Sequence, residues 1–211
     1  MAAGFTEPEL LKLEKLLPVY EKAREIFISK LNIIHQDFIR KNNYNPIEHI
    51  KGRIKSPESI AAKLQKLNLE ITADNARRHL NDICGARIIC PFAKDIYGLT
   101  GLLTSSPDWK VRELKDYIAN PKPGGYRSYH LILGLQIPYS GKEEEIPVEV
   151  QIRTASMDFW ASMEHKVRYK YREHVPKHLS DELAICAEKI AELDKRMQLI
   201  QEIVTLINEE D

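Results

Sequence analysis

The sequence predicts an α+β domain, a β-sheet flanked by helices, with long helices near both ends of the chain. Three observations predict this class. Apolar residues recur at helical spacing over residues 7–40 and 179–207. Residues 148–153 alternate strictly between apolar and polar, which is typical of a half-buried strand. Residues 83–90 form an almost continuous apolar run, as expected of a fully buried strand.

Length, charge and cysteine content limit the classes of protein to which this chain can belong. The chain has 211 residues, the size of one domain with helical extensions, and 31 basic residues balance 31 acidic ones. This balance argues against a broad nucleic-acid-binding surface but leaves room for a local basic cleft. The three cysteines lack metal-type spacing and suit a reducing compartment. Because no signal peptide or membrane-length apolar run is recognised, we expect a cytoplasmic protein with no membrane contact.

The chain divides into three predicted regions. Residues 1–44 form an N-terminal helical region, broken near Pro18 and ended by Asn45-Pro46. Residues 45–173 form the central domain, and residues 174–211 form a C-terminal helix whose apolar residues approach heptad spacing. Both terminal regions are expected to serve packing or assembly.

Basic side chains gather around a predicted helix start near residue 57. Ser56 is suited to be the N-cap and Pro57 to be the first helical residue, after a short strand over residues 49–55. Helix N-termini bind anions, so the nearby cations predict a phosphate cradle. The cradle consists of Arg53, Lys55, Ser59 and Lys63. A solvated basic face explains these four residues equally well on their own.

Two charged residues flank or interrupt the buried strand over residues 83–90. Asp82 stands just before it, beside the cradle, where a magnesium ligand is expected. Arg87 lies inside it and needs an anion or a carboxylate as a partner. The alternative is an Asp cap and an arginine that extends to solvent.

An aromatic residue and a carboxylate mark two further strands. Tyr126 follows a turn-rich loop and begins a predicted strand on which it shares a face with His130. It could stack on a base, although packing is the commoner role of such a residue. Glu149, Gln151 and Arg153 share the polar face of the strand over residues 148–153. This carboxylate could hold a metal or accept a proton, and the alternative is a solvated edge strand.

Five ordered motifs resemble the synthetase domain of the RelA/SpoT family, over about residues 45–171. They are Gly52-Arg53-Ile54-Lys55 with Ser59 and Lys63, Asp82 to Arg87, Asp116-Tyr117-Ile118, Gly125 to His130, and Glu149 to Thr154. Long members of this family add a hydrolase domain and regulatory domains, for which this chain has no room. The sequence therefore resembles a small, single-domain alarmone synthetase of the RelP/RelQ type.

The resemblance implies transfer of pyrophosphate from ATP to the 3′-hydroxyl of GDP or GTP, giving the alarmones ppGpp or pppGpp and AMP in the stringent response. It also implies a nucleotidyltransferase-like mixed sheet, a Mg²⁺ cofactor and a homotetramer. The implied ATP-binding residues are Arg53, Lys55, Ser59, Lys63 and Arg87. Those for GDP or GTP are Lys115, Lys122, Tyr126, His130 and Gln151. Asp82 and Glu149 are the implied catalytic and metal-binding residues, with Glu164 as a further metal candidate.

Some positions depart from the family pattern. Gly124 stands where many long members carry Asn, and His49 and Lys51 stand where the RelQ type has an aromatic residue and a threonine in its alarmone cleft. A regulatory nucleotide or a single-stranded RNA remains a candidate partner. The sequence is also compatible with two alternative functions. One is pyrophosphate transfer from ATP to an adenine nucleotide or an RNA 3′ end, and the other is a non-catalytic nucleotide- or RNA-binding module.

Overall fold

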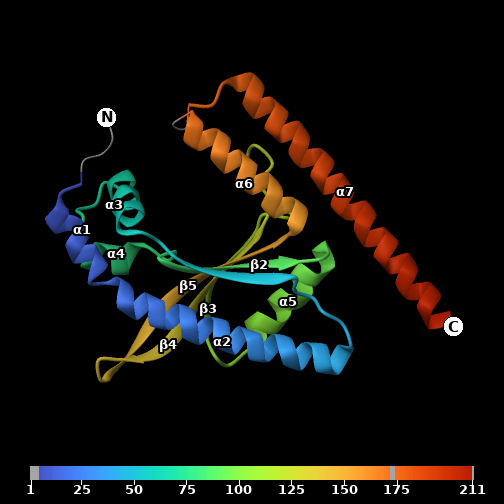
Figure 1. Cartoon of the computed structure of the whole chain (residues 1–211), viewed down its shortest axis with the longest axis horizontal. Coiled ribbons are helices and arrows are strands. Elements are labelled where there is room, and N and C mark those ends of the chain that lie inside the picture. The colour runs from blue at the N-terminus through green and yellow to red at the C-terminus, as the bar shows by residue number, and fades with distance from the viewer. Residues whose placement is uncertain (1–4, 172–173, 211) are drawn as a thin grey trace.

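A computed structural model describes residues 5–171 and 174–210 and contains one five-stranded sheet (Figure 1). Along the sheet the strand order is β1-β2-β5-β4-β3. The bounds are β1 His49–Ile54, β2 Cys84–Cys90, β3 Lys110–Asp116, β4 Tyr129–Tyr139 and β5 Lys142–Thr154. β2 and β5 pair in parallel and the other neighbours are antiparallel, so the sheet is mixed, as predicted.

The two faces of the sheet differ in character. Val148, Val150 and Ile152 of β5 are fully buried on one face, together with Cys84 and Ile88 of β2. This face belongs to the main hydrophobic core. The opposite face carries the polar residues of the same strands, which the strand register brings into rows. The alternation predicted from the sequence is therefore confirmed.

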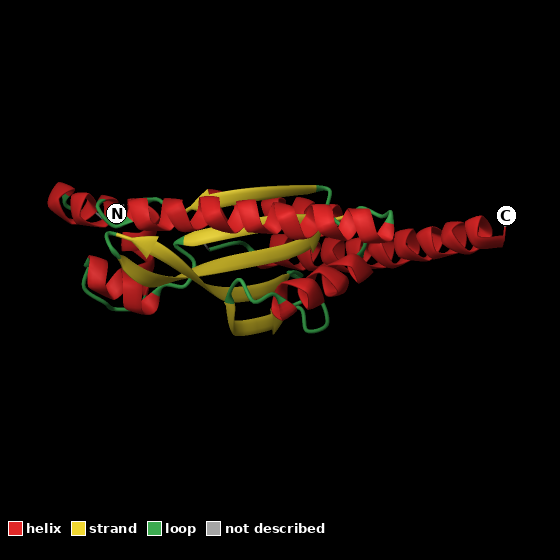
Figure 2. Cartoon of the chain, turned by 90° about the horizontal axis from the view of Figure 1, so that it is seen from below, coloured by secondary structure: helices red, strands yellow, loops and turns green. Residues whose placement is uncertain are grey.

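Two helices precede the sheet in the chain, and the longer one covers its apolar face. α1 spans Glu7–Glu14 and α2 spans Leu17–Asn42, so the predicted break falls just before Pro18. Figure 2 shows α2 as the long helix in front of the strands. Its side chains Val19, Tyr20, Ala23, Phe27 and Leu31 are buried in the same core as the sheet. The N-terminal helical region thus packs as part of the central domain.

Three further helices lie in the chain between β1 and β3, and the first of them begins where the sequence predicts. α3 spans Pro57–Lys66, and the Ser59 backbone N–H donates to the Ser56 hydroxyl over 3.3 Å, which confirms the N-cap. α4 spans Ala73–His79, and Thr72 caps it. α5 spans Ala93–Ser105 and covers the sheet beside α2.

The two C-terminal helices form a second, smaller hydrophobic cluster, while Met157 of the first also belongs to the main core. α6 spans Ala155–Lys170 and α7 spans Lys177–Glu210. They meet in a small second cluster built on Trp160, Ala161 and Ala187. The Trp160 indole N–H donates to the Leu183 carbonyl over 2.9 Å. Over the described residues, none of the helices is both long enough and apolar enough to span a membrane.

The predicted start of β4 differs from the observed one. β4 begins at Tyr129, so Tyr126 lies before this strand and not within it. The reason is a turn: both Gly124 and Gly125 have positive φ, and the chain joins the sheet only after them. The boundary predicted at residue 173 lies outside the described residues.

Gly125 holds the turn against α7, and its replacement by alanine is expected to destabilise the protein. Its φ is +94°, and an added Cβ would lie 2.3 Å from the Ala187 Cβ. Backbone strain and overpacking together predict a loss of about 2 to 4 kcal/mol in the free energy of unfolding, measured by denaturant titration.

Gly124→Ala is the matched control. Its φ is +92°, but no atom lies within 4 Å of the added Cβ. It should therefore cost only the backbone strain, about 1 kcal/mol. Equal losses in the two variants would contradict a tight contact between this turn and α7.

Candidate active site

Strand order divides the predicted site residues into two groups. β5, which carries Glu149, lies between β2 and β4. On its β2 side lie Arg87 and, one strand further, Arg53 of β1. On its β4 side lie His130 and, one strand further, Lys115 of β3. The sheet therefore places two predicted ATP-binding residues on one side of Glu149 and two predicted acceptor-binding residues on the other, while Gln151 lies on the same strand as Glu149.

The Glu149 carboxylate is surrounded by donors. Gln151 Nε2 donates to its Oε2 over 2.8 Å, and Arg53 Nη2 donates to the same atom over 3.3 Å. His130 Nδ1 lies 3.6 Å from its Oε1. Burial opposes ionisation, but these neighbours outweigh burial and lower the pKa of Glu149 to about 2. The group is a carboxylate at neutral pH, suited to binding a cation or orienting a hydroxyl.

A glycine allows Arg53 to reach Glu149 across an intervening strand. Arg53, Gly85 and Glu149 lie in one row on the polar face, on β1, β2 and β5 respectively. A Cβ at Gly85 would lie 3.2 Å from the Glu149 carbonyl oxygen and 3.4 Å from Arg53 Nε. A side chain here would push the guanidinium away from the carboxylate. Glycine is therefore required at position 85 for the contact between Arg53 and Glu149.

Asp82 joins the phosphate cradle. Its Oδ2 accepts from Lys63 Nζ at 2.8 Å and from Lys55 Nζ at 3.1 Å. Burial favours the neutral acid, but the two ammonium groups outweigh it and hold the pKa of Asp82 below its ordinary value. The other oxygen, Oδ1, is buried without a hydrogen-bond partner. An orphaned carboxylate oxygen beside phosphate-binding cations suits a Mg²⁺ ligand.

The part of the chain that the structure describes offers no preformed metal site beside Asp82. Within residues 5–171 and 174–210, no three or more His, Cys, Asp or Glu side chains gather in a way that could hold a metal. Mg²⁺ commonly takes one or two carboxylates and completes its shell with water and substrate phosphates. Asp82 and Glu149 therefore fit a metal that arrives with a nucleotide.

Two further predicted site residues, Ser59 and Glu164, make no direct contact with Glu149 or Asp82 among the described contacts. The Ser59 hydroxyl accepts from the Ser56 hydroxyl over 3.1 Å, near the start of α3. Glu164 forms an ion pair with Arg168, one turn further along α6. No described contact joins Glu164 to Asp82 or to Glu149.

Tyr126 lies in an aromatic and cationic group on the β4 side. Its hydroxyl is 2.8 Å from His130 Nε2, and its ring meets the rings of Tyr117 and His130 edge to face. Lys122 Nζ and the Arg153 guanidinium each lie 5.0 Å from the Tyr126 ring centroid. A base that stacks on Tyr126 would thus compete with a cation for the ring. Lys115 pairs with Glu113 at 2.8 Å on the edge strand.

Arg153 and Asp158 are central residues that are missing from the site residues implied by the family resemblance, although Arg153 follows Glu149 on the same polar face and could hold phosphate. The Arg153 side chain is 4% exposed and donates to Ser128, Gln151, Asp158 and the Tyr126 hydroxyl. Asp158 also pairs with Arg87 at 3.0 Å. The available signal in the sequence is an arginine at the end of an alternating strand, because such a charge requires a carboxylate nearby wherever the strand is buried.

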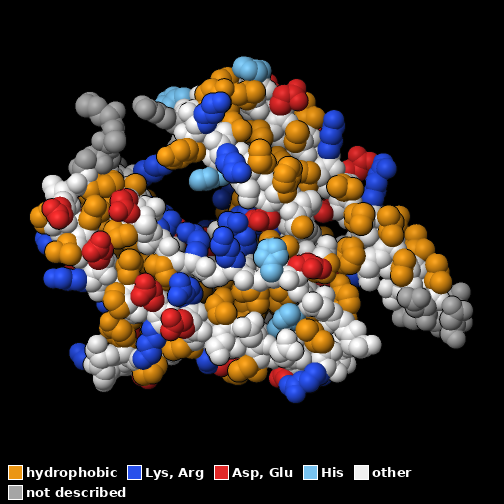
Figure 3. Space-filling model, in the orientation of Figure 1, with side chains coloured by type: hydrophobic (Ala, Val, Ile, Leu, Met, Phe, Trp, Pro, Cys, Tyr) orange, Lys and Arg blue, Asp and Glu red, His pale blue; other side chains and the backbone are white. Residues whose placement is uncertain are grey.

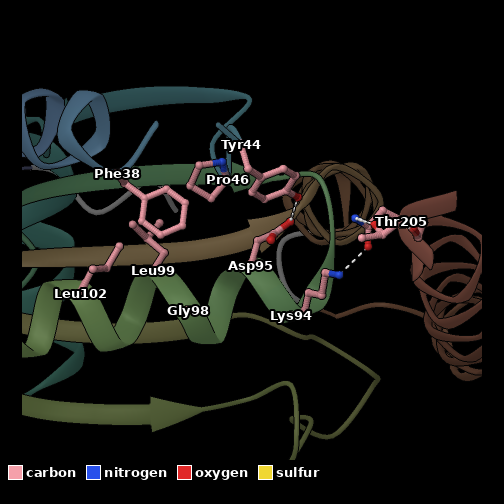
Figure 4. A pocket seen from close by; sticks show the side chains of 10 residues that line it. Phe38, Tyr44, Pro46, Lys94, Asp95, Gly98, Leu99, Leu102 and Thr205 are labelled. Carbon is pink, nitrogen blue, oxygen red and sulfur yellow. Dashed lines mark hydrogen bonds between the residues drawn. The ribbon is translucent and has the colours of Figure 1, made fainter. Parts of the chain in front are cut away.

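A hollow opens over the polar face, between α3 and α6. Figure 3 shows Lys and Arg side chains gathered within it. A separate apolar pocket of about 440 Å³ lies between the end of α2, α5 and α7 (Figure 4). There the Tyr44 hydroxyl donates to Asp95 over 2.7 Å. None of the predicted site residues lines this second pocket.

Comparison with known proteins decides the family. The region described as found in RelA/SpoT proteins matches residues 52–174. The chain belongs to the RelA/SpoT family. The match covers the cradle, Asp82, Tyr126 and Glu149.

Individual RelA/SpoT relatives match over most of their length. GTP pyrophosphokinase YwaC of Bacillus subtilis (strain 168) is 45% identical over 181 residues, which are 86% of either chain. GTP pyrophosphokinase YjbM of the same strain is 34% identical over 188 residues, covering 89% of this chain and 88% of YjbM.

Solved RelA/SpoT structures share the fold. Small alarmone synthetase 2 from Bacillus subtilis superposes with a TM-score of 0.80 at 43% identity, covering 90% of this chain and 97% of that one. Small alarmone synthetase 1 from the same organism, bound to its product pppGpp, gives a TM-score of 0.84 at 34% identity, with 91% and 97% coverage.

Proposed function

We propose that this RelA/SpoT protein is a GTP pyrophosphokinase, a (p)ppGpp synthetase of the cytoplasm. It transfers pyrophosphate from ATP to the 3′-hydroxyl of GDP or GTP and releases AMP. One observation carries the proposal most directly. The Glu149 carboxylate lies on the central strand, between a basic cradle on the β2 side and an aromatic, cationic group on the β4 side. The relatives named GTP pyrophosphokinase support the same assignment.

The β2 side would bind ATP. Arg53 and Arg87 would contact the adenine and the phosphates, and Lys55, Lys63 and Ser59 would hold the phosphate chain. Lys55 and Lys63 now pair with Asp82 and are therefore already close to one another. Phosphoryl-type transfer depends on positioning and charge neutralisation, which converging cations provide.

The β4 side would bind the acceptor nucleotide. Tyr126 would stack on guanine, and Lys115, Lys122 and His130 would contact its phosphates and sugar. Gln151 donates to Glu149 and accepts from Arg153, so its direct role would be to hold this carboxylate in place. Glu149 would then orient or deprotonate the 3′-hydroxyl.

Mg²⁺ would be held by Asp82 and Glu149, with Glu164 as a less central candidate. When bound, the ion would neutralise charge on the transferred group. The chain's own contribution is two carboxylates that are ionised at neutral pH, since the pKa of each is lowered.

Chromatographic product analysis tests the proposal. Purified protein is incubated with ATP, Mg²⁺ and GMP, GDP or GTP in parallel, and AMP together with guanosine 3′-diphosphates is expected. AMP without a guanosine product would indicate another acceptor, and no AMP at all would contradict the proposal. Adding ppGpp or single-stranded RNA to the same assay tests regulation by either.

We also propose a homo-oligomer, with the homotetramer as the specific expectation. Four apolar side chains of α7 recur at spacings of four, three and four residues, and each is about half exposed: Leu193 51%, Met197 46%, Ile200 53% and Val204 50%. Apolar side chains run along this helix in Figure 3. A sustained exposed stripe of this kind favours a partner helix, and a second copy of the chain provides one.

Charge within this stripe should break the assembly. Ile200→Glu combined with Val204→Glu is expected to shift the protein to monomer in light scattering after size exclusion, because two carboxylates would be buried in an apolar interface. Glu188→Lys changes charge at an exposed position of α7 outside the stripe and should leave the mass unchanged. A wild-type monomer, or a double variant of unchanged mass, would contradict this interface.

A further inference from the structure

Asp158 connects two arginines that lie on neighbouring strands. It belongs to the first turn of α6, the helix that follows β5 directly. Its Oδ1 accepts from Arg87 Nη1 of β2 and from Arg153 Nη1 of β5, each over 3.0 Å. A single carboxylate oxygen of α6 therefore holds two guanidinium groups, one from each strand.

The two arginines depend on Asp158 to different degrees. Arg153 has three further partners, namely Ser128, Gln151 and the Tyr126 hydroxyl. Arg87 has none among the described residues: its one hydrogen-bonding or ion-pair partner is Asp158, and its Nε is buried without an acceptor. Loss of the Asp158 charge would leave Arg153 in place and release Arg87.

Electrostatic repulsion would drive the released Arg87 side chain away from Arg153. Burial and the Arg153 charge both lower the pKa of Arg87, and Asp158 opposes them. Without this carboxylate, two like charges would face each other with no counter-ion between them. The Arg87 side chain is 36% exposed, so it has room to turn toward solvent.

We propose that Asp158 is a positioning residue that holds the Arg87 guanidinium over the ATP side of the site. The inference rests on the proposed function, in which Arg87 contacts ATP. Asp158 touches neither substrate in this assignment and acts through Arg87. Because Arg153 keeps its other partners, the acceptor side should be affected much less.

Binding of the ATP analogue AMPCPP, measured by calorimetry, tests the inference without turnover. Asp158→Asn keeps the shape and one acceptor oxygen but removes the charge, and it should weaken AMPCPP binding about tenfold, as expected for the loss of a charge-assisted hydrogen bond. The KM for ATP should rise by a similar factor, while the KM for GDP should change less than about threefold. Asp158→Glu restores the charge and should recover part of the binding. Glu192→Gln, which breaks an exposed ion pair with Arg196 on α7, should bind like the wild type.

A double-mutant cycle separates positioning from a general structural role. In an Arg87→Ala background, Asp158→Asn should cause no further loss of AMPCPP binding, because the group through which it acts is gone. Unchanged AMPCPP binding in the single variant, or an additional loss in the Arg87→Ala background, would overturn the inference. Wild-type protein that neither binds AMPCPP nor forms AMP would overturn the proposed function, and this inference with it.

Discussion

Glu149→Gln should lower the rate of pyrophosphate transfer by about a thousandfold, the scale on which a positioned carboxylate contributes to catalysis. The amide has nearly the same shape and can still accept a hydrogen bond from Gln151 or Arg53. It cannot take a proton or neutralise a cation. The measurement is AMP formation from ATP, Mg²⁺ and GDP under saturating conditions.

Glu143→Gln is the matched control, since it makes the same change on the same strand at an exposed position. Its activity should equal that of the wild type. A Glu149→Gln variant that retains more than about a tenth of the activity would show that this carboxylate is not central to the transfer.

The same variant should change how stability depends on pH. Glu149 has a folded-state pKa of about 2, below the ordinary value of 4.5. Its ionised form therefore stabilises the fold above pH 4.5, and this contribution is lost as the pH falls toward 2. Glu149→Gln should lack this acid-dependent component in thermal melts.

Asp82→Asn should separate nucleotide binding from turnover. Turnover should fall about a hundredfold or more, on the scale seen when charge-stabilising groups are removed. The Asp82 carboxylate now neutralises Lys55 and Lys63, and the amide would free both ammonium groups for phosphates. Binding of AMPCPP without metal should therefore be retained or strengthened, and added Mg²⁺ should no longer improve it.

Asp74→Asn serves as the control, because this exposed residue in the first turn of α4 lies outside the cradle. Calorimetric titrations of AMPCPP with and without Mg²⁺ give the comparison. A Mg²⁺ effect of wild-type size in Asp82→Asn would contradict the assignment of Asp82 as a metal ligand.

Local patterns in the sequence predicted much of this architecture. Ser56 identifies a helix start because its side-chain oxygen bonds one of the first backbone N–H groups, and the structure contains this cap. The alternation over residues 148–153 separates a buried face from a polar one, because successive strand side chains point to opposite sides. These signals act over a few residues, and nearby side chains suffice to determine them.

The structural positions of Tyr126 and Asp158 are harder to predict from the sequence. Tyr126 was predicted inside a strand, but two positive-φ glycines delay the start of β4 to Tyr129. In the sequence, Asp158 is an ordinary acidic residue in the first turn of a helix, where its negative charge interacts favourably with the helix dipole. Its two arginine partners come from β2 and β5, and no local pattern indicates such a contact.

Residue types and their alternation thus settle which side chains share the polar face of each strand. They do not settle which strands are neighbours, since that depends on how the whole core packs and on pairings far apart in the chain. Only the tertiary structure places β5 between β2 and β4, with Arg53 reaching over Gly85 to Glu149. The meeting of the cradle, the central carboxylate and the aromatic group follows from that order of strands.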